Sequence, residues 1–265
     1  MILRSLVFKP RIARHGSLHI LAPRTCCPLP HPEALVAEFL LRWLHYLGGI
    51  TWIGLLYYFN FVQGPFMAEA DPAAKSTATQ KLVPRALRWF RGGAILTFLT
   101  GLAIIGKRIG ESPLGAAGWS TPWAITILTG GLFGTLMFFN VVLVIWPKQQ
   151  IVIASAKAAA SGGQANAAAP AAARRAFLAS RTNVVFSIPM LFFMGAASHY
   201  TLPGGGNHAA YWASVLLVAA LLEINSLTAT SGATTKPIEK IPGVIVTGFV
   251  VWAIVYAIAR AFLSP

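Results

Sequence analysis

Two of the six histidines in this sequence lie within or at the end of long apolar stretches, where an ionisable side chain is costly. His45 falls in "LLRWLHYLGGITWIGLLYYFNF", and His199 closes "FFMGAASHY". Neutral imidazoles on facing helices can ligate the iron of a b-type haem, and a neighbouring glycine lets a flat macrocycle approach the backbone. With Gly48 and Gly49 they predict a haem b site. The alternative is that His45 makes a hydrogen bond between helices and the glycines allow close packing.

A second group of polar residues lies in or beside other apolar stretches and combines amides and cations with one acid. Glu223 in "AALLEINSL" is a candidate catalytic proton acceptor, because intramembrane carboxylates serve as proton relays or anchors. Its alternative is a structural role, in a salt bridge or in a hydrogen bond to Asn225 or Asn183. Amides both donate and accept, and arginine pairs with anionic oxygens, so the group predicts a binding site for a polar anion. The members that would bind the anion are Asn60, Asn140, Asn183, Asn225, Arg88, Arg91 and Arg181, with Arg85 beside them.

The elements that position both groups are apolar segments long enough to cross a bilayer. Hydrophobic residues make up 56% of the 265 residues and charged residues 11%, whereas soluble domains carry about a quarter charged residues. We predict an all-α, polytopic integral membrane helix bundle, with Gly130 and Gly134 in a helix contact and Pro147 ending the third span. Its six transmembrane helices are expected at about 36–62, 87–106, 121–146, 183–200, 209–228 and 242–263.

The net charge of +14 resides in loops and tails. This distribution favours the lipid bilayer as partner and argues against nucleic acid. Lysine and arginine concentrate after the first, third and fifth spans, so the positive-inside rule predicts these loops in the cytoplasm and both termini outside. Alternation of the spans then places His45 and His199 in one leaflet and the anion-binding group in the other.

The chain divides into a leader and a membrane domain. Residues 1–33 are basic and contain no acid before Glu33, which fits either a targeting segment or an extension from a wrongly assigned start codon. We therefore treat them as a leader or tail outside the fold and give their histidines, His15, His19 and His31, no role. Residues 34–265 form the six-helix domain, with a low-complexity Ala/Gly loop at about 155–175 that is either a flexible linker or a helix extension. Cys26 and Cys27 are adjacent and fit neither a C-x-x-C-H haem attachment nor a zinc spacing, so no metal site is predicted.

Four quoted stretches follow one another in a distinctive order along the chain. They are "LRWLHYLGGITWIGLLYYFNFVQGPFMAEA", "LVPRALRWFRGGAILTFLTGL", "FNVVLVIWPKQQIV" and "ASRTNVVFSIPMLFFMGAASHY". In this order they resemble the membrane portion of the bacterial membrane-bound urate hydroxylase family, the urate oxidase N-terminal domain. The resemblance covers about residues 36–200 and is less distinctive in the last two spans.

The resemblance implies an inner-membrane oxidoreductase that oxidises urate to 5-hydroxyisourate in purine catabolism. In that family the electrons pass to a c-type cytochrome, which is fused at the C-terminus of full-length members. This sequence ends at Pro265 without a C-x-x-C-H, so we expect a short form served by a separate cytochrome c. The resemblance supplies no site residues. In its framework the arginines and asparagines would bind the urate anion, Glu223 would accept a proton, and a haem at His45 and His199 would relay electrons.

Two other functions stay open at this point. One is a non-catalytic haem-binding or assembly subunit of a membrane redox complex, which would bind a cofactor without turning over urate. The other is a small transporter, which is disfavoured because the six spans show no inverted repeat of two halves.

Overall fold

The structure is a computed structural model that describes residues 32–264. Of the predicted leader only residues 32 and 33 belong to this range, in the first turn of the first helix; His15, His19 and His31 lie outside it. The described residues contain six helical segments long and apolar enough to cross a membrane, and this confirms the predicted all-α, polytopic bundle.

The first three spans are each built from several consecutive helical elements. Span one consists of α1 (Pro32–Tyr57), η1 (Tyr58–Gln63) and α2 (Gly64–Glu69); span two of α3 (Pro72–Thr77), η2 (Ala78–Leu82) and α4 (Val83–Gly110); span three of α5 (Pro122–Phe139), η4 (Asn140–Ile145) and α6 (Trp146–Ala160). The other spans are α7 (Ala169–His199), α8 (His208–Thr228) and α10 (Ile241–Leu263), with short η3 (Gly115–Ser120) and α9 (Lys236–Glu239) in loops.

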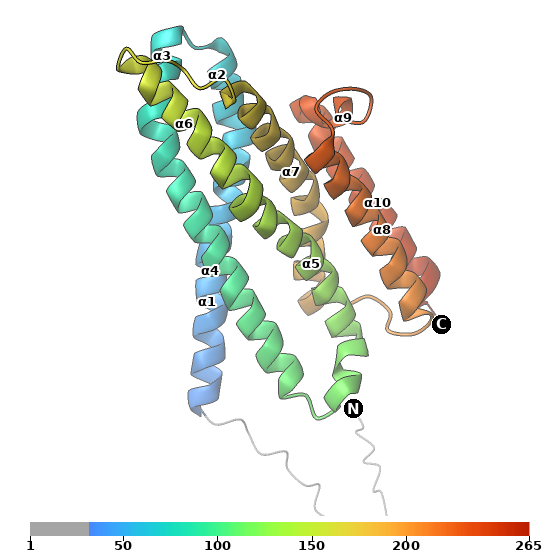
Figure 1. Cartoon of the computed structure of the whole chain (residues 1–265). Helices are drawn as coiled ribbons and strands as arrows, with labels where there is room; N and C mark the ends of the chain where they lie inside the picture. Colours follow the sequence, from blue (N-terminus) through green and yellow to red (C-terminus); the bar gives the residue numbers. More distant parts are fainter. Residues whose placement is uncertain (1–31, 265) are drawn as a thin grey trace, which may run out of the picture.

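Helix α7 lies at the centre of the bundle. It packs against α5 and α6 on one side and against α10 and α8 on another, while α1 and α4 form a closely packed pair (Figure 1). Two thirds of its most apolar stretch is buried, 67% against 17–39% in the other spans, so α7 is the most buried of the six spans. Residues of α7 line both cavities described below.

The two ends of the bundle differ in charge. We call the end formed by α2, α3, the loop 161–168 and α9 the cation-rich end; the loops 111–121 and 200–207 and the C-terminus form the opposite end (Figure 1). The elements at the cation-rich end carry Lys75, Lys81, Arg85, Lys148, Lys157, Arg174, Arg175, Lys236 and Lys240.

Glycines set the closest helix contacts. A Cβ at Gly93 of α4 would lie 3.0 Å from the carbonyl oxygen of Gly48 on α1, and a Cβ at Gly130 of α5 would lie 3.0 Å from the backbone nitrogen of Met194 on α7. Side chains at these positions would force the helix backbones apart. Gly134 is different, because a Cβ there would meet Met190 Cγ at an ordinary 3.7 Å. The predicted helix contact is thus made by Gly130.

Each of the elements η1, η2 and η4 is a π-helix, and each ends two residues before a proline: Pro65, Pro84 or Pro147. Proline has no N–H and its ring collides with the carbonyl group of residue i−4 in an α-helix. Pairing each N–H with residue i−5 widens the turn before the proline and allows the helix to continue. Prolines in these three spans therefore mark a local widening.

Several predicted boundaries are corrected by this arrangement. Pro147 does not end the third span, because the helix continues through α6 to Ala160. The α7 helix begins at Ala169, well before the predicted start at residue 183. The loop between them is shorter than predicted and comprises residues 161–168, since helices occupy both flanks of the Ala/Gly-rich stretch. Alanine is the strongest helix former, which explains the extension.

The loop that carries α9 is fastened to α7 by an ion pair. Arg174 Nη2 lies 2.5 Å from Glu239 Oε1, and Arg174 Nε donates to the carbonyl oxygen of Thr230 at 2.8 Å. The hydrogen bond from Arg174 lowers the pKa of Glu239 below its usual value, with a smaller contribution from the Thr235 hydroxyl. At a pH above the ordinary pKa of glutamate, the Glu239 carboxylate therefore stabilises the loop. This stabilisation is lost as the pH falls through the lowered pKa of Glu239.

We expect hydrogen exchange in residues 229–240 to stay slow at neutral pH and to accelerate as the pH falls below the ordinary pKa of a glutamate carboxyl, after correction for the intrinsic rate. Glu239→Gln should give faster exchange at neutral pH and remove the pH dependence. Glu111→Gln, at the opposite end of the bundle, is the matched control and should leave this loop unchanged. Equal pH dependence in the Glu239→Gln protein would contradict the assignment.

Candidate functional site

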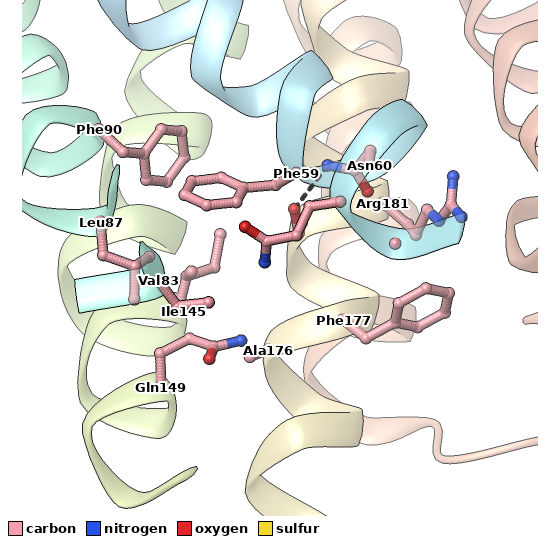
Figure 2. A pocket seen from close by; sticks show the side chains of 13 residues that line it. Phe59, Asn60, Val83, Leu87, Phe90, Ile145, Gln149, Ala176, Phe177 and Arg181 are labelled. Carbon is pink, nitrogen blue, oxygen red and sulfur yellow. Dashed lines mark hydrogen bonds between the residues drawn. The ribbon is translucent and has the colours of Figure 1, made fainter. Parts of the chain in front are cut away.

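A small cavity, lined in part by five polar residues, lies between η1, α4, η4, α6 and α7, in the half of the bundle near the cation-rich end. Its volume is about 130 Å³, the space of about four water molecules. We call it the polar cavity. Figure 2 shows Val83, Leu87 and Phe90 of α4 on one side of it and Asn60 and Arg181 on the other. Two of the three π-helices contribute to its wall, η1 and η4, and η2 ends next to Val83.

Asn60 connects η1 to α7 at the edge of this cavity. Its buried Nδ2 donates to the carbonyl oxygen of Leu56 and to Ser180 Oγ, both at 2.8 Å (Figure 2 draws the second bond). Both amide hydrogens are therefore used within the protein. The Oδ1 atom of Asn60 keeps its capacity to accept hydrogen bonds from a molecule in the cavity.

Arg181 is the most unusual residue in the lining. The residue is 5% exposed, yet its Nε and Nη1 have no hydrogen-bond partner, and neither of the ion pairs in residues 32–264 involves it. Its guanidinium lies 5.0 Å from the ring of Phe177, a favourable but weak contact. Gln63 Oε1, also in the lining, is buried without a partner too. Unpaired buried donors and acceptors cost free energy, so it is notable that two donors and one acceptor of the lining residues lack a partner.

The predicted anion-binding group is split by the structure. Asn140 Nδ2 donates to Asn183 Oδ1 at 2.9 Å and to Glu223 Oε2 at 3.0 Å, and Asn183 Nδ2 donates to the carbonyl oxygen of Met137 at 3.0 Å. This amide cluster joins span three, α7 and α8. Its three side chains line neither the polar cavity nor the larger cavity described below. Only Asn60 and Arg181 of the predicted group line the polar cavity.

The other predicted members lie elsewhere. Asn225 Nδ2 donates to the carbonyl oxygen of Thr234 at 3.2 Å, and the guanidinium of Arg91 lies 3.9 Å above the Trp146 ring. Arg88 is exposed, as is Arg85. Sequence reasoning missed Gln63, Gln149 and Ser180 of the lining. Gln63 and Gln149 each lie two residues from a proline, Pro65 or Pro147. Prolines inside apolar helices are therefore the sequence feature from which these two glutamines could be predicted as lining residues.

A second, larger cavity occupies the half of the bundle near the opposite end. It has a volume of about 640 Å³ and lies between α1, α4, α5 and α7. We call it the large cavity. Its lining includes His45 and Gly49 but neither Gly48, which is buried against α4, nor His199, which is exposed at the end of α7. The structure thus separates the two predicted haem ligands. Within residues 32–264 no three His, Cys, Asp or Glu side chains come close enough to hold a metal ion.

Comparison with known proteins identifies the family. No curated protein and no solved structure matches the sequence significantly. The profile of the urate oxidase N-terminal family matches residues 115–258, which include Arg181 and the whole amide cluster. The matched residues cover η3, span three, α7 and α8 and most of α10, whereas the resemblance in the sequence was strongest in the first four spans. Since this match extends over more than half of a chain that forms a six-span helix bundle, the protein belongs to the urate oxidase N-terminal family.

Proposed function

We propose that this protein is a membrane-bound oxidoreductase that hydroxylates urate and passes the electrons to a c-type cytochrome. Urate and one water molecule give 5-hydroxyisourate, two protons and two electrons. A cytochrome haem iron accepts one electron, so each turnover reduces two ferric cytochromes. Family membership supports the substrate class. The observation that carries the proposal is Arg181, a buried residue of the cavity lining whose Nε and Nη1 have no hydrogen-bond partner.

The free polar atoms of the polar cavity complement a urate monoanion. Urate is flat and presents carbonyl oxygens and N–H groups around its edge. If their side chains rotate toward the cavity, the two unpaired N–H groups of Arg181 would donate to the anionic oxygens and Gln63 Oε1 would accept from a ring N–H. Phe59 and Phe90, with ring centres 5.4 Å apart and planes at 88°, supply aromatic surface on the same cavity. These contacts would orient the ring for attack by water.

The position of the polar cavity suits a water-soluble substrate. Eighteen residues separate Arg181 from His199 at the end of α7, a rise of about 27 Å along the helix, against a hydrocarbon core of about 30 Å. Arg181 therefore lies near the membrane surface at the cation-rich end, which the positive-inside rule assigns to the cytoplasm. The exposed cations of that end, Arg85 and Arg88 among them, would raise the local concentration of an anion.

The test is turnover by the purified full chain in proteoliposomes, with urate as substrate and ferricytochrome c as acceptor. We expect two ferricytochromes reduced per urate consumed, and oxygen from labelled water in 5-hydroxyisourate. Saturable urate binding without turnover would favour a different acceptor, which an added quinone would reveal. A protein that neither binds nor oxidises urate would refute the proposal.

The second candidate function is a non-catalytic cofactor-carrying subunit, which the large cavity and His45 favour. Such a subunit would bind a redox cofactor and would leave urate untouched in the same assay.

Glu223 is expected to have a structural role, because it accepts a hydrogen bond from Asn140 and lines neither cavity. Glu223→Gln keeps an acceptor oxygen and should leave urate turnover within about twofold of the wild type. Glu223→Leu removes the hydrogen bond and should lower the free energy of unfolding by about 0.6–1.7 kcal/mol, measured in detergent. Loss of turnover in a Glu223→Gln protein of normal stability would instead restore the catalytic carboxylate that the sequence predicted.

A further inference from the structure

We propose that the large cavity binds a b-type haem, with His45 Nε2 as an axial ligand of the iron. Binding does not depend on the proposed urate chemistry; only the role of the haem as an electron relay rests on it. The cavity volume of about 640 Å³ falls within the range of about 300–1,000 Å³ typical of ligand and cofactor sites. Its wall is mostly apolar, as a porphyrin ring requires.

The hydrogen bonds around His45 prepare its Nε2 atom to bind a metal. His45 Nδ1 lies 3.2 Å from Thr100 Oγ1. The single hydroxyl hydrogen of Thr100 is donated to the carbonyl oxygen of Leu96 at 2.6 Å, so Thr100 accepts the hydrogen bond from Nδ1–H. In the neutral ring Nε2 then carries the lone pair, which is the state of a haem-ligating imidazole. The same state argues against a quinone, whose carbonyl oxygen needs a donor.

Glycines leave open space along the wall of the large cavity. A Cβ at Gly49, Gly54 or Gly195 would meet no atom within 4 Å, although all three residues line the cavity. Gly101, by contrast, lies directly against the imidazole: a Cβ there would be 3.0 Å from His45 Cε1, so only glycine leaves room for the ring. The backbones of α1 and α7 are thus bare toward the cavity, and a planar macrocycle can contact them directly.

Two arginines in the lining suit the carboxylates of haem. Arg42 precedes His45 by about one helical turn, and Arg108 is near the end of α4 at the opposite end of the bundle. Arg42 Nη2 is 2.6 Å from Glu38 Oε1, and Arg108 lies 4.5 Å above the Trp123 ring, so both guanidinium groups keep donors for a further anion. Their position would direct the propionates toward the membrane surface.

This site replaces the pair of histidines predicted from the sequence. His199 does not line the cavity, and the other soft donors in the lining are the thioethers of Met190 and Met194. His45 is three residues from Arg42, a rise of about 4.5 Å, so the iron would lie in the half of the membrane nearer the opposite end of the bundle. It would take one electron at a time from the substrate side, cycling between Fe(III) and Fe(II), and pass it to ferricytochrome c at the opposite end.

The experiment is an absorption spectrum of the full chain, purified in detergent from cells supplied with a haem precursor, oxidised and then reduced with dithionite. We expect a Soret band, a b-type α-band on reduction and about one haem per chain. His45→Gly should lose the haem and regain it when imidazole is added, which separates ligand loss from misfolding. His199→Ala should keep the full spectrum. Thr100→Val should retain the fold and bind haem about tenfold more weakly.

A matched pair of glycine variants tests the space. Gly49→Leu should exclude haem, whereas Gly106→Leu, at an exposed glycine on α4 outside the lining, should not. Haem that stays equally bound in His45→Gly without imidazole would overturn the proposal. So would a colourless, folded protein that co-purifies with a quinone; the unpaired indole N–H of Trp52 in the lining could serve such a ligand. Failure of the urate assay would leave these spectra unaffected, so the two proposals fail separately.

Discussion

Replacing Arg181 with methionine is expected to abolish urate turnover while leaving the folded protein at least as stable as the wild type. The guanidinium would supply two charge-assisted hydrogen bonds to urate, so its loss should lower kcat/KM by about 100-fold or more. Without substrate, the same N–H groups are buried and unpaired. Methionine removes that penalty, and the free energy of unfolding should stay unchanged or rise by about 1–3 kcal/mol.

The measurement combines steady-state kinetics with thermal unfolding in one detergent. Arg181→Lys keeps a charge but cannot present the planar pair of donors, so it should recover only part of the activity. Arg88→Met is the control. It removes an exposed arginine of α4 that does not line the polar cavity, and it should change kcat/KM only slightly. A clear loss of stability in Arg181→Met would show that the arginine has a structural partner and would remove the basis of the proposed substrate site.

Replacing Gly130 with leucine is expected to separate α5 from α7 and to prevent accumulation of folded protein. Even the Cβ of an alanine would lie 3.0 Å from the Met194 nitrogen and 3.2 Å from the Met190 carbonyl oxygen. These are backbone atoms of the most buried helix and cannot rotate away as a side chain would. Gly130→Ala should therefore cost about 1–3 kcal/mol, the usual cost of overpacking, and Gly130→Leu more.

Gly134→Ala is the matched control one helical turn away, because its Cβ would make an ordinary contact of 3.7 Å with Met190 Cγ. Fluorescence-detected size exclusion after heating would rank the three proteins. Equal stability of Gly130→Ala and Gly134→Ala would contradict the close approach of α5 and α7.

The fold class could be predicted from composition alone, because segments of about 20 apolar residues have few alternatives to a membrane span. The ends of the helices could not. A proline such as Pro147 usually ends a helix. Here the preceding π-helical turn accommodates the proline, which has no N–H to donate, and the helix continues. Residues 155–160 and 169–175 look like a linker by composition, yet alanine favours the helix there.

The candidate sites show the limit of grouping polar residues by depth. Asn140, Asn183 and Glu223 do share one hydrogen-bonded cluster, as residues at one level on facing helices would. The depth of a residue in the membrane does not show on which side of α7 its side chain lies. The amide cluster and Arg181 lie at similar depth but on different sides of α7. The same limit applies to His45 and His199, which share a leaflet but not a cavity.

The widened turns before Pro65, Pro84 and Pro147 also change what an insertion or deletion means in this family. One extra residue in a helical turn rotates everything beyond it by about 100°. The faces of α2 and α6 are thus out of phase with those of α1 and α5, and the phase shift turns Gln63 and Gln149 toward a common interior. A relative shorter by one residue in both η1 and η4 would carry every residue type of the polar cavity and still point its amides elsewhere. Alignment gaps at these two places would therefore separate members able to use this cavity from members that only share the bundle.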